Sequence, residues 1–162
     1  MLRQLELVEK VKAYDPFVEE ELLNKAYIFS MRAHGSQTRA SGDPYFSHPV
    51  EVAGILADHK FDSKTIITAL LHDVVEDTPS TASDIKKKFG SQVAKLVDGL
   101  SKLDKVQFAN DTEAQAENFR RMLLAMSQDV RVILIKLADR LHNMRTIKFI
   151  KDENKRIDIS ME

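Results

Sequence analysis

The sequence has no cysteine, and it contains only five glycines and four prolines among 162 residues. The lack of cysteine excludes disulfides, thiolate metal sites and a cysteine nucleophile, and it agrees with a reducing compartment. The low glycine and proline content, together with 43% apolar residues, is typical of a packed globular protein rather than a disordered chain. We therefore expect a single domain.

An excess of charge of one sign is also lacking, since 24 Lys and Arg residues stand against 25 Asp and Glu residues. A general nucleic-acid binder is strongly basic, so this balance argues against nucleic acid as a partner. No apolar stretch approaches the length of a bilayer span, and charges interrupt the first residues. We expect a cytoplasmic protein that does not bind membranes. Any affinity for phosphate must come from one local site rather than from the overall charge.

Apolar residues recur at helical spacing along most of the chain, and this pattern predicts an all-α fold. The expected helices cover residues 3–13, 18–32, 50–58, 64–76, 84–89, 93–100, 113–126 and 130–144. The last range contains β-branched residues that favour strand, but its apolar pattern is too long for a strand and favours one buried helix. Residues 34–48 and 102–112 are expected to form loops, the second of them mobile, and Ser83 is expected to cap the helix that begins at Asp84.

Ionisable residues interrupt two of the apolar helical segments. His72 and Asp73 continue the first segment, and Asp139 follows the second. Burying such groups without a partner is costly, so we expect them to share one. With His48, at the junction of the loop and the next helix, they form a set of two imidazoles and two carboxylates that suits Mn²⁺, Fe²⁺ or Zn²⁺. Such an ion would activate water and polarise a phosphoryl oxygen.

A structural explanation competes with a metal site. Histidine beside aspartate is common, and buried Asp–Arg or Asp–His pairs often only hold helices together. The combination of four such residues, rather than any one pair, favours the metal site.

Glu76 and Asp77 follow the His-Asp pair by one helical turn, so they are candidates to present acid groups to the attacking water. The alternative is a solvated helix end. Carboxylates at a helix C-terminus are unfavourable with respect to the helix dipole, however, and this cost favours a functional role.

Polar residues near Asp139 and in the loop are candidates for substrate binding. Asn143 and Thr146 lie on the same helical stripe as Asp139, where they can hold a base or a ribose. Arg39 in the loop can bind phosphate or stack on a base, although loop arginines are usually just exposed. The remaining histidines have no evident companions in the sequence, and we expect them to be surface or core residues: His34, His59 and His142.

Three segments at these positions resemble the N-terminal hydrolase domain of the RelA/SpoT homologue (long Rel/Spo) family of HD-domain phosphohydrolases: HGSQTRASGDPYFSHP, ALLHDVVEDT and VILIKLADRLHNMRT. The resemblance runs over nearly the whole chain. It implies an all-α HD-domain helical bundle and Mn²⁺-dependent removal of the 3′-pyrophosphate from ppGpp or pppGpp, which gives GDP or GTP and pyrophosphate. Synthetase-dominated members lose the His-Asp pair, which this chain keeps, so hydrolysis is the expected direction.

The resemblance also implies roles by position. The family's metal ligands fall on His48, His72, Asp73 and Asp139. Its acidic pair, which assists the attacking water, falls on Glu76 and Asp77, and its nucleotide-contacting positions fall on Arg39, Ser41, Asn143 and Thr146. Ala40 departs from the family, which often has a basic residue there, and this change implies a weaker grip on the nucleotide.

Hydrolase domains of the family continue through further helices, whereas this sequence ends at Glu162. We therefore expect residues 1–162 to form an HD-type hydrolase domain that is truncated at its C-terminal end. A homo-oligomer or a partner protein would then supply the missing helices.

Two alternative functions stay open. One is a phosphohydrolase for another nucleotide, such as a deoxynucleoside monophosphate, and the other is a non-catalytic fragment that binds guanine nucleotide or a partner protein.

Overall fold

The computed structural model of the chain describes residues 2–104, 115–120, 123, 129–147, 157 and 160. Within these ranges the regular structure is helical, and the β pairing is limited to an isolated antiparallel bridge between Thr38 and Pro44. The helices are α1 (Gln4–Lys12), α2 (Glu20–His34), α3 (Ser47–Asp58), α4 (Ser63–Leu71), α5 (Val74–Asp77), α6 (Ala82–Phe89), α7 (Ser91–Asp104) and α9 (Arg131–Thr146). The prediction of an all-α single domain is confirmed.

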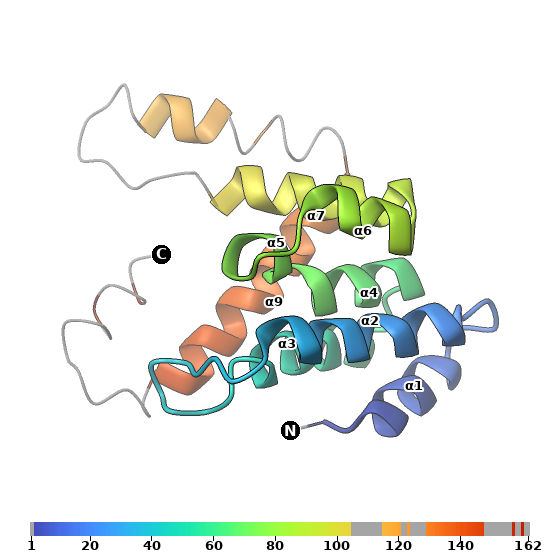
Figure 1. Cartoon of the computed structure of the whole chain (residues 1–162). Coiled ribbons are helices and arrows are strands. Elements are labelled where there is room, and N and C mark those ends of the chain that lie inside the picture. The colour runs from blue at the N-terminus through green and yellow to red at the C-terminus, as the bar shows by residue number, and fades with distance from the viewer. Residues whose placement is uncertain are drawn as a thin grey trace.

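Helix α4 forms the centre of the bundle. Every residue of α4 except Lys64 is buried, as expected for a segment that is apolar nearly all round. It packs against α2, α3, α7 and α9. Figure 1 shows α4 between the layer of α2 and α3 and the layer of α6 and α7. His72, the first residue after α4, is therefore buried inside the molecule.

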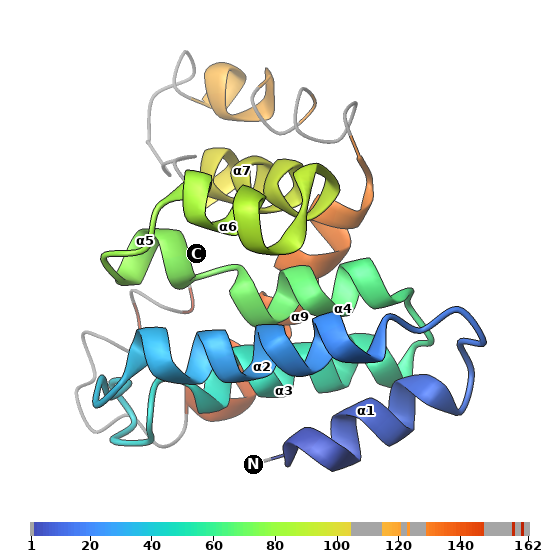
Figure 2. The same cartoon turned by 45° about the vertical axis from the view of Figure 1, so that its right-hand side comes forward.

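The remaining helices cover this centre. Helix α1 packs on α2 and α3 at the end of the bundle that lies away from α6 and α7 (Figure 2). The core side chains come from all the layers and include Leu7, Leu23, Ile66, Leu70, Ile85 and Leu100. None of the described helices is long and apolar enough to span a bilayer.

Helix α9 is one helix despite its β-branched beginning. Val132, Ile135 and Ala138 are buried where α9 packs on α3, α4 and α7. Burial of this face therefore outweighs the strand propensity of single residues. The prediction of one helix is confirmed, but the expected burial holds for one face only. Exposed apolar side chains on α9 are Leu137, Leu141 and Met144.

Three predictions about helix ends are wrong. Helix α3 begins at Ser47 rather than at residue 50, so Ser47 and His48 of the expected loop are helical. The helix expected over residues 64–76 is interrupted at His72 and Asp73, which form a turn between α4 and α5. Helix α7 extends to Asp104, so residues 102–104 are helical rather than loop. Residues 105–112 of that expected loop lie outside the described residues, and of the helix expected over 113–126 the described residues, 115–120 and 123, are helical.

The cap of α6 also differs from the prediction. Thr81, not Ser83, is the N-cap residue, because α6 begins at Ala82. The Thr81 hydroxyl accepts a hydrogen bond from the Asp84 N–H at 3.2 Å, and the Asp84 carboxylate accepts one from the Thr81 N–H at 2.9 Å. This reciprocal pair satisfies two backbone donors at once, which a cap at Ser83 would not do.

The loop between α2 and α3 folds back on itself. The Arg39 N–H donates to the Asp43 carbonyl and the Tyr45 N–H donates to the Gln37 carbonyl, each at 2.8 Å. At the tip, Gly42 has a φ of 92°, a conformation that side chains with a Cβ rarely adopt. The folded loop gives Arg39 and Tyr45 defined backbone positions just before α3.

Candidate metal centre and nucleotide cavity

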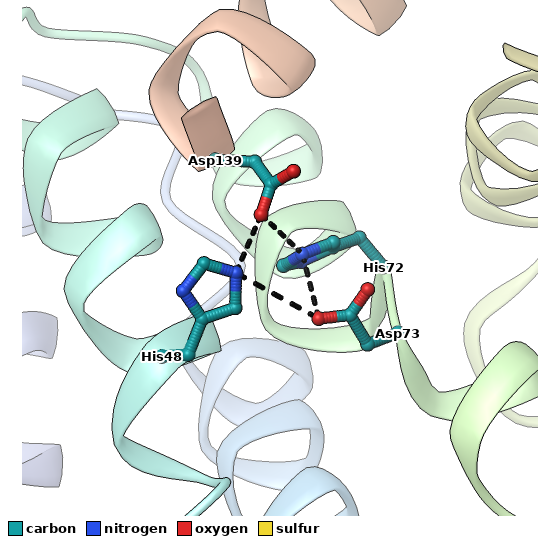
Figure 3. Close-up of side chains that lie close together, drawn as sticks. All are labelled: His48, His72, Asp73 and Asp139. Atoms are coloured by element: carbon teal, nitrogen blue, oxygen red, sulfur yellow. Dashed lines mark hydrogen bonds and ion pairs between the residues drawn. The ribbon is translucent and has the colours of Figure 1, made fainter. Parts of the chain in front are cut away.

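Four side chains converge where α3, the turn after α4 and α9 meet. One nitrogen or oxygen atom from each of His48, His72, Asp73 and Asp139 lies within 4.8 Å of the other three. Figure 3 shows the two imidazoles and the two carboxylates pointing toward one another. The His48 Nε2 atom is 2.5 Å from Asp139 Oδ1, and the His72 Nε2 atom is 2.9 Å from Asp73 Oδ2. Residues that lie 91 positions apart in the sequence thus share one site.

The turn after α4 explains how two consecutive residues reach the same point. In a continuous helix, neighbouring side chains diverge by about 100° around the axis. Here α4 ends at Leu71, and Asp73 has left regular helical geometry with φ −98° and ψ −5°. The interruption of the helix therefore lets His72 and Asp73 face the same side.

The surroundings of His72 fit a bound cation. Its Nδ1 atom is 2.5 Å from the Ala69 carbonyl oxygen, which can only accept, so in the neutral ring the proton is on Nδ1. Its Nε2 atom is buried and has no hydrogen-bond partner among the described residues, although Asp73 is close. A lone pair that faces carboxylate oxygens is unfavourable unless a proton or a metal cation lies between them. Two imidazoles and two carboxylates without sulfur suit a first-row divalent ion.

In the metal-free cluster the two carboxylates favour a proton on His72, and a divalent ion would take the place of that proton. Burial alone would lower the pKa of His72, but Asp73 and Asp139 outweigh it and raise this pKa well above its usual value. Burial opposes ionisation of Asp139, yet the adjacent imidazoles of His48 and His72 hold its pKa well below the usual range. The pKa of Asp73 is lowered for the same reason, with His72 again outweighing burial. Both carboxylates are therefore negative at neutral pH, as metal ligands must be.

Lys136 and His142 contact the outer side of the cluster. The Lys136 ammonium donates to Asp139 Oδ2 at 3.1 Å and leaves Oδ1 facing the two imidazoles. The His142 Nδ1 atom lies 2.7 Å from the His48 Nδ1 atom. Burial, with His48 and Arg39, lowers the pKa of His142 to about 4, so this ring is neutral at pH 7. The expectation that His142 has no companion is wrong, and its position three residues after Asp139, on the same helical face, was the missed signal.

Tyr45 is a second residue that the sequence did not reveal. Its hydroxyl lies 2.7 Å from Asp77 Oδ2 and 3.3 Å from Asp73 Oδ2, so it joins a candidate ligand to one of the acidic pair. Burial and the two carboxylates raise the pKa of Tyr45, which keeps its proton available. The ring also stacks on the buried His34, with centroids 4.8 Å apart. His34 is therefore a core histidine, whereas His59 is exposed.

The two members of the acidic pair differ in their surroundings. Burial raises the pKa of Asp77, and Tyr45 ties this carboxylate to the cluster. Both side chains are exposed on α5, but of the two only Asp77 is bound by the Tyr45 hydroxyl. The structure thus brings Asp77, but not Glu76, to the site.

A cavity of about 320 Å³ opens beside the cluster, at the small end of the usual range for ligand pockets. Its lining includes all the residues expected to contact nucleotide, Arg39, Ser41, Asn143 and Thr146, and three of the candidate metal ligands, His48, Asp73 and Asp139. The Arg39 guanidinium bridges the cavity wall: it donates to Asn143 Oδ1 at 2.6 Å and to Thr146 Oγ1 at 3.3 Å. Ser41 donates to Asp43 at 3.0 Å within the loop.

The family model described as HD domain matches residues 26–162. The chain belongs to the HD domain family. Its all-α bundle and the His-Asp pair after α4 fit this assignment, and the arrangement of four candidate ligands, three of them buried, is suited to a divalent metal ion.

Relatives confirm the resemblance to the RelA/SpoT homologues. The chain is 57% identical over 162 residues to the GTP pyrophosphokinase rsh of Brucella abortus (strain 2308), and it covers 22% of that protein. It is 53% identical over 150 residues, 93% of its own length, to the bifunctional (p)ppGpp synthase/hydrolase SpoT of Escherichia coli (strain K12), of which it covers 21%. The chain therefore spans about a fifth of the length of these relatives.

A solved structure shares the fold. It is described as a metazoan orthologue of SpoT that hydrolyses ppGpp and plays a role in starvation responses. The TM-score is 0.66 with 30% sequence identity, over 83% of this chain and 76% of the metazoan chain.

Proposed function

We propose that residues 1–162 act as one HD-type hydrolase domain that removes the 3′-pyrophosphate from ppGpp or pppGpp with Mn²⁺ as cofactor. The observation that carries the proposal is the convergence of four ligand atoms beside a cavity lined by Arg39, Asn143 and Thr146. The activities named for the E. coli and metazoan relatives support this substrate. Water adds to the phosphorus bonded to ribose O3′, O3′ leaves and takes up a proton, and pyrophosphate is released.

The metal would be held by His48, His72, Asp73 and Asp139. When bound, a divalent cation supplies Lewis acidity, which favours deprotonation of water and stabilises charge on phosphoryl oxygens. Mn²⁺ is preferred over Zn²⁺ because two of the four ligands are hard carboxylate oxygens. The chain's own contribution is to hold these carboxylates in place through hydrogen bonds from Lys136 and Tyr45.

The nucleotide would occupy the cavity between the loop and α9. Arg39 supplies a planar cation that can stack on a base or bind a phosphate. Asn143 and Thr146 now accept hydrogen bonds from Arg39, and entry of the nucleotide would exchange these contacts for contacts to the base and ribose. Ser41 adds a hydroxyl at the rim.

Asp77 and Glu76 are proposed to assist the attacking water. Asp77 is the better placed, because the Tyr45 hydroxyl links it to Asp73, and burial shifts its pKa upward, in the direction that a group exchanging a proton with water needs. The exposure of both carboxylates of the pair favours a second candidate function, in which the chain binds guanine nucleotide without turnover.

The test is to incubate the purified chain with ppGpp and Mn²⁺ and to follow the release of GDP and pyrophosphate, with a metal-free control. His72→Ala and Asp73→Ala should each abolish release, because each removes a ligand. His59→Ala is the matched control, since it removes an exposed imidazole elsewhere and should leave release unchanged. Tight ppGpp binding without release by the folded, Mn²⁺-loaded wild type would replace the hydrolase with the binding function.

A further inference from the structure

The imidazole of His48 makes a specific contact on the side that faces away from the candidate metal position. Its Nε2 atom faces Asp139 at 2.5 Å and Asp73 at 3.8 Å, whereas its Nδ1 atom lies 2.7 Å from the Nδ1 atom of His142. The two rings are inclined by 31° with centroids 5.0 Å apart. Two imidazole nitrogens at this distance need one proton between them, so one ring donates and the other accepts.

Arg39 identifies the ring that accepts. Its Nη1 atom lies 3.4 Å from His142 Nδ1. A guanidinium has donors only, so the His142 Nδ1 atom presents a lone pair and carries no proton. His48 Nδ1 is therefore the donor, and the Nε2 atom of a neutral His48 is left with its lone pair on the side of the two carboxylates.

His72 has the equivalent arrangement. Its Nδ1 atom faces the Ala69 carbonyl at 2.5 Å, and its Nε2 atom faces the same cluster. Histidines that bind metals commonly donate their second ring N–H to such an acceptor, which selects the tautomer and fixes the ring. The acceptor for His72 is a backbone atom, whereas the acceptor for His48 is a side chain that can be replaced.

We propose that His142 is a positioning residue of the metal centre, whose Nδ1 atom accepts the proton of His48 Nδ1 and keeps the lone pair of His48 Nε2 directed at the ion. This inference rests on the proposed function, because it assumes that the four converging residues bind a metal. It assigns no contact with the ion or the substrate to His142. The pair Arg39 and His142 would also connect the nucleotide cavity to the metal centre through one chain of hydrogen bonds.

The experiment measures the dissociation constant of Mn²⁺ on metal-free protein from the electron paramagnetic resonance signal of free Mn²⁺. The variants are His142→Leu and His142→Asn, which have similar shapes, while only Asn offers an acceptor near the position of Nδ1. We expect His142→Leu to weaken Mn²⁺ binding by roughly 10- to 100-fold, as removal of such outer partners does, and His142→Asn to retain most of the affinity. Hydrolysis of ppGpp by His142→Leu should recover at saturating Mn²⁺. His59→Leu, at an exposed histidine, should change neither quantity.

Any other result for the His142 variants overturns the inference. Unchanged affinity in His142→Leu would show that the contact does not position His48, and tighter binding would show that His142 donates rather than accepts. Equal losses in the Leu and Asn variants would assign His142 a packing role. A wild type that neither binds Mn²⁺ nor hydrolyses ppGpp would overturn the proposed function as well, whereas an active wild type with an unaffected His142→Leu variant would overturn this inference alone. If His142→Leu does not fold, His142→Ala removes the same acceptor and takes its place.

Discussion

Tyr45 holds two carboxylates together with one hydroxyl. The oxygen lies 2.7 Å from Asp77 and 3.3 Å from Asp73, in surroundings that raise the pKa of the phenol. It therefore stays protonated and limits the repulsion between two neighbouring negative groups. Without this proton, Asp73 would lose a partner that orients it toward the candidate metal position.

Tyr45→Phe should lower Mn²⁺ affinity or turnover by roughly 10-fold or more, because residues that orient metal ligands typically contribute this much. Steady-state kinetics across a Mn²⁺ titration provides the measurement. Tyr27→Phe is the control, since Tyr27 donates to the Leu2 carbonyl at 3.1 Å and does not line the cavity. Wild-type kinetics in Tyr45→Phe would show that the contact plays no part in the site.

Individual residues also show what the sequence could and could not predict about the site. His72, Asp73 and Asp139 stood out because polar groups on apolar helices need a partner, and the structure does place them together with His48. Tyr45 gave no such signal, since a tyrosine in a polar loop has no sequence pattern that reveals where its hydroxyl points. The roles of these residues stay predictions, because proximity alone does not establish chemistry.

Apolar periodicity predicted the helices well, because most of them bury one face and the buried residues of that face recur at helical spacing in the sequence. The ends were harder to predict. The helix is interrupted at His72 and Asp73 where both side chains turn toward His48 and Asp139. Local sequence does not reveal this arrangement, because His48 and Asp139 are distant along the chain. The cap of α6 was readable in principle, since Thr81 and Asp84 stand at the spacing of a capping box.

Thr81→Ala should reduce the free energy of unfolding by about 1 kcal/mol, because the N-cap side chain satisfies a backbone donor of α6. In a domain of this size the melting temperature would fall by roughly 2–4 °C. Ser83→Ala should have almost no effect, since Ser83 is exposed inside the helix. Thermal and urea unfolding followed by circular dichroism measures both. A larger loss in Ser83→Ala than in Thr81→Ala would mean that α6 begins later than described.

For the whole molecule, the candidate ligands tie together segments that are distant along the chain. His48 lies in the first turn of α3, His72 and Asp73 follow the central helix α4, and Asp139 lies on α9. Helix α9 packs on both α3 and α4, so the site is formed only when the bundle is assembled. An ion that binds these four residues binds the folded state, and its binding free energy adds to the stability of the entire fold.

Addition of Mn²⁺ to metal-free protein should therefore raise the melting temperature. At a concentration about 100 times the dissociation constant the expected gain is ~2.7 kcal/mol. For a chain of this length that gain corresponds to an increase of roughly 5–10 °C. Asp73→Asn should lose most of the increase, whereas Asp98→Asn, at an exposed carboxylate paired with Lys102, should keep it. An equal increase in melting temperature in both variants would show that Mn²⁺ binds outside the cluster, because only Asp73→Asn removes a candidate ligand.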